Sequence, residues 1–137
     1  MLKLIRKLTT TLLLFSLASC FGLFDSGSDT VVDNYDVTWI DLHEHRALYK
    51  NEQLVPPYVF AVGHNSKYIF VKQHPLLLNS PQKIDKSVVN YYIIERTKSD
   101  LQDKPQFGPM TKDEFDKLCS DLGISEPQFD LSYPTNL

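Results

Sequence analysis

The sequence predicts an α+β domain, an antiparallel β-meander of about five strands with one C-terminal helix packed on a face. Residues 58–62 and 68–71 are two runs of β-branched and aromatic residues around a Gly-His-Asn-Ser stretch, which is typical of a β-hairpin. Residues 88–97 form a third such run. All three runs are apolar on both faces of a strand, so we expect them in the middle of the sheet, covered on both sides.

The hairpin register follows from the position of the reversal. A reversal centred on His64 and Asn65 places Phe60 opposite Ile69. Side chains alternate between the two faces of a strand, so this register assigns each side chain to a face. One face then carries Tyr58, Phe60, Val62, Ile69 and Val71, and the other carries Val59, Ala61, Tyr68 and Phe70.

A single helix is predicted after residue 111. Thr111 suits the N-cap position, and Glu114, three residues later, completes a capping box. Gly123 supplies the stop. Apolar residues recur at helical spacing between these ends and predict one stripe facing the sheet. They are Phe115, Leu118, Cys119 and Leu122.

The segments between these elements are less regular. Residues 35–42 alternate as a half-buried strand, and residues 43–49 fit an edge strand with mixed faces. Residues 74–86 form a long connection that contains three consecutive leucines at 76–78. We interpret these leucines as part of a loop folded over one face of the sheet. The alternative is an exposed ridge that binds a partner. Residues 124–137 contain two prolines and are expected to run extended across the surface.

The N-terminus has the pattern of an export signal. A basic start is followed by an apolar run over residues 8–18, which is too short to span a bilayer comfortably. Residues 17–20 read Leu-Ala-Ser-Cys and resemble the lipobox of bacterial lipoproteins. That resemblance implies cleavage before Cys20, a diacylglyceryl group on its thiol, and further acylation such as palmitate on the freed amine. The alternative is an ordinary secretory signal with an incidental cysteine.

These features divide the chain into three parts. Residues 1–19 are the expected lipoprotein signal peptide, residues 20–33 the lipidated cysteine and a flexible tether, and residues 34–137 a single globular domain. The signal holds three of the 14 basic residues and none of the 17 acidic ones, so the mature charge is 11 − 17 = −6. This charge argues against nucleic acid and against electrostatic attachment to anionic lipid. We therefore expect membrane attachment through acyl chains on Cys20, with an envelope protein as a possible partner.

His43 and His45 are the nearest approach to a metal-ligand motif. On a strand, residues i and i+2 share a face, a spacing that two ligating imidazoles can use. The spacing does not match His-Glu-x-x-His, and no further ligand falls at a diagnostic position. We expect no metal and no other cofactor, and we keep a metal- or small-ligand-binding lipoprotein that uses this pair as the alternative function.

Two other features have a structural and a functional interpretation. Cys119 could pair with a histidine as nucleophile and base, but its place on the helical stripe predicts a buried, small hydrophobic residue. The aromatic residues could form a binding face, with Tyr35, Trp39 and Tyr91 the first to check for exposure, but a sheet core explains them equally well.

The sequence contains no nucleophile elbow, no glycine-rich phosphate loop and no Cys-x-x-Cys pair, so we expect no enzymatic activity. The stretch YVFAVGHNSKYIFVKQ, the later YYII and the segment GPMTKDEF resemble a family of small bacterial lipoproteins that has only been described as a domain of unknown function. The resemblance implies no activity and no site residues. The resulting expectation is a non-enzymatic binding or interaction module anchored in the bacterial cell envelope.

Overall fold

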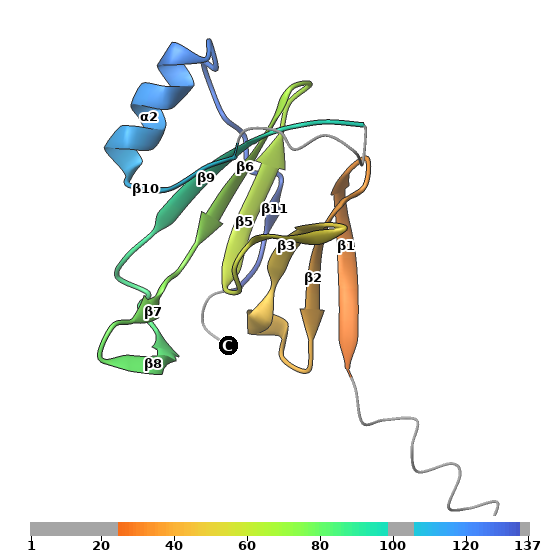
Figure 1. Ribbon diagram of the computed structural model, residues 1–137, viewed down its shortest axis with the longest axis vertical. Helices are drawn as coiled ribbons and strands as arrows, with labels where there is room; N and C mark the ends of the chain where they lie inside the picture. Colours follow the sequence, from red (N-terminus) through yellow and green to blue (C-terminus); the bar gives the residue numbers. More distant parts are fainter. Residues whose placement is uncertain (1–24, 99–105, 135–137) are drawn as a thin grey trace, which may run out of the picture.

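The computed structural model describes residues 25–98 and 106–134, which form two antiparallel sheets, a short hairpin and one α-helix (Figure 1). One sheet has the strand order β1-β2-β3-β4, the second β10-β9-β6-β5-β11, and the hairpin is β7-β8. The strands are β1 (Ser26–Val32), β2 (Tyr35–Ile40), β3 (Ala47–Lys50), β4 (Glu52–Val55), β5 (Val59–His64), β6 (Tyr68–Gln73), β7 (Leu76–Leu77), β8 (Ser80–Ile84), β9 (Asn90–Glu95), β10 (Gln106–Met110) and β11 (Leu131–Ser132). The helices are the 3-10 turn η1 (His43–His45) and α2 (Lys112–Asp121).

The five-stranded sheet is the central layer. One of its faces packs on the four-stranded sheet through a cluster that includes Tyr35, Leu48, Val62 and Val71. Its other face packs on α2 through a second cluster that includes Phe115. The predicted α+β class is therefore confirmed, and so is the prediction that β5, β6 and β9 are covered on both sides.

The predicted antiparallel meander corresponds to the central sheet, and the structure adds a second sheet that was not expected. Strands β5, β6, β9 and β10 do follow meander order in the central sheet, and β11 is added beside β5. Residues 26–55 instead form a sheet of their own. Tyr35 and Val37 alternate with partly exposed residues, so β2 has one apolar face, and this face is buried against the central sheet.

The predicted hairpin register was wrong by four residues. His64, not Phe60, lies opposite Ile69, and the reversal spans residues 65–67. The side chain of Asn65 closes this longer turn because its Oδ1 accepts hydrogen bonds from the backbone N–H groups of Lys67 (2.8 Å) and Tyr68 (2.7 Å). A bulge between residues 59 and 61 also brings Val59 onto the face of Val62, which the predicted alternation did not allow.

Helix α2 begins and ends as predicted. Thr111 Oγ1 accepts from Glu114 N at 3.3 Å, and the Glu114 carboxylate accepts from Thr111 N at 2.8 Å, which makes a complete capping box. Gly123, just beyond the C-terminus, has φ +73°, a conformation that glycine adopts without steric cost. Phe115 and Cys119 are the buried residues of the helix and face the central sheet.

Strand β1 occupies half of the segment 20–33 that was predicted to hold the lipidated cysteine and a flexible tether. Its residues 26–32 pair with β2, and side-chain hydrogen bonds join Ser28 to Thr38 (3.0 Å) and Thr30 to Asp36 (2.8 Å). Gly27 lies against the Trp39 ring, where a Cβ would come within 2.1 Å of a ring carbon. The Ser, Gly and Asp residues at 26–29 that suggested a tether are thus strand residues that pair with β2, and Gly27 makes room for an aromatic ring. Cys20, the predicted lipidation site, lies outside the described residues.

Candidate functional site

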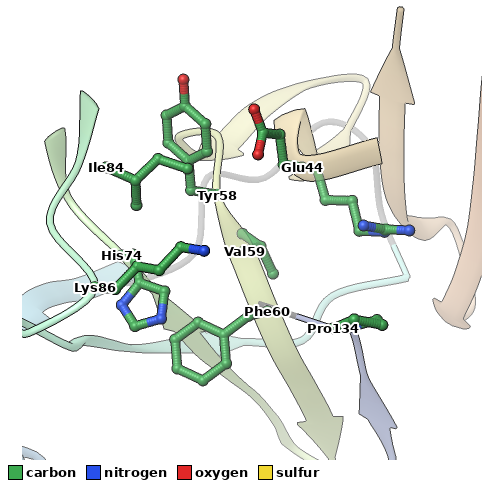
Figure 2. A pocket seen from close by; sticks show the side chains of 9 residues that line it. Glu44, Tyr58, Val59, Phe60, His74, Ile84, Lys86 and Pro134 are labelled. Atoms are coloured by element: carbon green, nitrogen blue, oxygen red, sulfur yellow. The ribbon is translucent and has the colours of Figure 1, made fainter. Parts of the chain in front are cut away.

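A small pocket lies between η1, the start of β5 and the base of the β7–β8 hairpin (Figure 2). Its volume is about 30 Å³, far below the roughly 300–1,000 Å³ of a typical small-molecule site. The pocket therefore fits a water molecule or the tip of a side chain rather than a metabolite. Its lining residues are Glu44, Arg46, Tyr58, Val59, Phe60, His74, Ile84, Lys86 and Pro134.

Tyr58 has an unusual backbone at this pocket. Its φ of +75° is rare for a bulky residue and is tolerated only where neighbouring contacts fix it. The adjoining backbone is held by three hydrogen bonds, from Val59 N to Arg46 O (2.9 Å), from His74 N to Tyr58 O (3.1 Å) and from Gln73 Nε2 to Pro57 O (2.9 Å). These contacts join η1, β5 and β6 and give the strain a structural explanation.

His74 is the histidine most tightly held in the fold. Its ring is 8% exposed and stacks on Phe60 with 4.2 Å between the ring centres. Figure 2 shows the two rings side by side and the Tyr58 hydroxyl pointing away from them. His74 Nδ1 lies 2.8 Å from Val88 O, and since a carbonyl only accepts, Nδ1 carries the proton. Both contacts fix the ring as part of the junction between β6 and β9.

Arg46 is also engaged in packing. Its guanidinium lies over Trp39 at 5.1 Å and over Tyr133 at 4.2 Å, and it donates to His43 O. The Tyr133 hydroxyl donates to Asp29 Oδ2 at 3.0 Å, and burial, reinforced by this bond, raises the pKa of the phenol well above its usual range. This cluster joins the C-terminal segment to the first sheet and leaves little of Arg46 for a ligand.

The predicted histidine pair is not on a strand. His43 and His45 lie in the 3-10 turn η1, where successive side chains point about 120° apart. His43 Nε2 lies 3.6 Å from Asp25 Oδ2, and its ring contacts Trp39, whereas the His45 ring contacts Tyr58. The shared strand face that motivated a metal site is therefore absent. Among residues 25–98 and 106–134, no three His, Cys, Asp or Glu side chains come together as a possible metal site.

The other candidate residues are mostly core. Tyr35 and Tyr91 are buried, and Trp39 is partly buried against Gly27, Arg46 and His43. Cys119 is buried on the sheet side of α2, and the burial raises the pKa of its thiol. The interpretation of these residues as core is confirmed for Tyr35, Tyr91 and Cys119.

The leucine run at 76–78 lies elsewhere in the structure than the sequence predicts. We expected these residues to cover a sheet face, but they lie on the β7–β8 hairpin, which extends from the body of the domain (Figure 1). Leu76 is 39% exposed, Leu77 36% and Leu78, in the turn, 100%. The run follows a buried strand and contains no polar residue, so composition alone did not distinguish an inward loop from an outward hairpin. We call β7, β8 and their turn, residues 76–84, the leucine hairpin.

The described residues contain no helix that is long and apolar enough to cross a membrane. No curated protein and no solved structure matches the chain. The family model described as "Protein of unknown function (DUF3997)" matches residues 30–132, which are 103 of the 137 residues. The match begins inside β1 and ends with β11, so it spans both sheets, the leucine hairpin and α2. The chain therefore belongs to the DUF3997 family.

Proposed function

We propose that this protein is a lipoprotein of the bacterial cell envelope, anchored through acyl chains on Cys20, whose domain is a non-enzymatic binding module. The observation that supports binding is the leucine hairpin, which holds three consecutive leucines away from the core. Exposing apolar surface opposes folding in water, and large exposed apolar patches mark sites that meet another surface.

The small pocket itself is not a candidate substrate site. Its polar residues Arg46 and His74 are held by aromatic rings and backbone carbonyls. Its volume of about 30 Å³ leaves no room for a substrate of ordinary size. The contacts of His74 with Phe60 and Val88 O lie at the base of the leucine hairpin, and the exposed hairpin is the better candidate for contact with a partner.

Metabolic labelling with an alkyne fatty acid tests the anchor. We expect the wild-type chain to take up the label and to fractionate with membranes, and Cys20→Ala to take up none. Cys119→Ala is the matched control because it removes the buried cysteine and should keep full labelling. A wild-type chain without label that fractionates away from membranes would contradict the lipid anchor.

A photo-crosslinking amino acid tests the binding surface in intact envelopes. Placed at Leu78, at the tip of the leucine hairpin, it should form adducts. Placed at Ser66, an exposed residue of the β5–β6 turn, it should form few. Equal adduct formation at the two positions would show that the hairpin is not a preferred binding surface.

A further inference from the structure

Five of the six large apolar side chains that are exposed in the described residues gather toward one end of the molecule. The leucine hairpin and the loop after β2 both lie at the lower end in Figure 1. In the loop after β2, Ile40 is 59% exposed and Leu42 49%. The opposite end, which includes the β5–β6 turn, carries none of the large hydrophobic residues that are exposed in residues 25–98 and 106–134. The domain therefore has one apolar end, formed by Ile40, Leu42 and the leucine hairpin.

The first strand after Cys20 in the sequence begins at this same end. Strand β1 begins at Ser26, which pairs with Ile40 of the apolar end. Cys20 is 26 − 20 = 6 residues earlier, and six residues span at most about 20 Å. Because the residues from Ser26 onward belong to β1, only the residues between Cys20 and Ser26 can separate a lipid from the sheet. A lipid on Cys20 would therefore keep Ser26 close to the bilayer surface.

We infer that the apolar end contacts the bilayer in which Cys20 is anchored, with the tip of the leucine hairpin entering the boundary between headgroups and acyl chains. This inference rests on the proposed lipidation of Cys20. Strands β7 and β8 pair with each other, which satisfies part of the backbone of the hairpin, and Leu78 at its turn can transfer to an apolar phase. Lys83, an exposed residue of the same hairpin, can keep its charge at the headgroup level.

The charge distribution indicates an apolar contact rather than an electrostatic one. Asp25, Asp41 and Glu44 surround Leu42, so anionic lipid would repel this loop. The leucine hairpin carries Lys83 and is followed by Asp85 and Lys86, so its own charge is small. We therefore expect the hairpin tip to enter zwitterionic bilayers, while the loop after β2 stays among the headgroups.

Lipid quenching of a fluorophore tests this orientation. The acylated full chain, in a Cys119→Ala background, carries an environment-sensitive dye at Leu78→Cys or at the control position Ser66→Cys, and is reconstituted into phosphatidylcholine vesicles. When lipids with a quencher on the acyl chain are included, the dye at position 78 should lose roughly half its emission or more, as expected at a depth of about 5–10 Å. The dye at position 66 should be unaffected. Both sites are exposed, so neither label disturbs the core.

Mass spectrometry of the same preparation separates the two proposals. An acylated chain whose dyes are equally unquenched would overturn the bilayer contact and leave the lipid anchor standing. If the photo-crosslinker at position 78 then gives a protein adduct, the leucine hairpin docks on an envelope protein instead. A chain that carries no acyl group on Cys20 would overturn the anchor and, with it, the contact.

Discussion

At the scale of single residues, Cys119 shows how burial determines reactivity. Its side chain is 4% exposed and packs beside Phe115 in the cluster between α2 and the central sheet. Loss of solvation, and secondarily the nearby Asp116 carboxylate, raise the pKa of the thiol. The nucleophilic thiolate is therefore scarce at neutral pH, which favours the structural interpretation of this cysteine.

We predict that Cys119 reacts slowly with a thiol reagent in the native protein and quickly after unfolding. Cys119→Ser should lower the free energy of unfolding by about 1–3 kcal/mol, because it places a hydroxyl in an apolar site. Lys117→Ala, at an exposed position on the same helix, is the control and should change stability by less than about 0.5 kcal/mol. Fast labelling of the native thiol would show that this face of α2 opens to solvent.

At the scale of elements, the N-terminus of α2 depends on its capping box. The Glu114 carboxylate accepts hydrogen bonds from Thr111 N and from the Thr111 hydroxyl. These bonds hold the pKa of the Glu114 carboxyl below its usual range. A carboxyl whose pKa is lower in the folded than in the unfolded chain stabilises the folded chain at pH values above its unfolded pKa. That stability is lost as the pH falls through the folded pKa.

We predict that Thr111→Ala lowers the free energy of unfolding by about 1 kcal/mol at neutral pH, while Thr111→Ser retains most of it. We also predict that Glu114→Gln reduces the loss of stability that the wild type shows below about pH 4.3, the ordinary glutamate pKa. Urea melts between pH 2 and 7 would measure both effects. If wild type and Glu114→Gln lost the same free energy of unfolding at low pH, the carboxylate would contribute nothing to the cap.

At the scale of the whole molecule, the three layers are joined through side chains of the central sheet. Phe70 is 1% exposed and contacts Phe115 of α2 and Phe129 of the C-terminal segment, with ring centres 6.4 Å apart in both pairs. On the other side, Arg96, just after β9, donates to Asp33 Oδ2 in the β1–β2 turn of the four-stranded sheet at 2.7 Å. Each layer thus depends on the central sheet for its position.

We predict that Phe70→Ala lowers the free energy of unfolding by about 3–5 kcal/mol, because it leaves a cavity between α2 and the sheet. Phe60→Ala, which removes an aromatic ring from the same hairpin, should cost clearly less because Phe60 is only half-buried. Denaturant melts of the two variants compare them directly. Equal midpoints would contradict the assignment of Phe70 to the interface between layers.

Local patterns in the sequence predicted the elements better than their assembly. The helix was predicted from Thr111, Glu114 and Gly123 because caps act within one turn of chain. The hairpin register depended on the Asn65 side chain and on a bulge, and the alternation of apolar residues reveals neither. The exposure of Leu76–Leu77 depended on whether a neighbouring layer exists to cover them, which is a property of the whole fold. His43 and His45 were misjudged because a three-residue helical turn has almost no periodicity to detect.

The place of β1 in its sheet has a mechanical consequence. In Figure 1, β1 runs along the long axis of the molecule and begins at the lower end. A pull on an anchor at Cys20 would act nearly along the strand, so the ladder from Ser26–Ile40 to Val32–Tyr35 would be loaded in shear, with its hydrogen bonds sharing the force. Bonds that break together resist far more force than bonds that peel one after another. If Cys20 is lipidated as we propose, β1 would thus also act as a force-resistant attachment between domain and lipid.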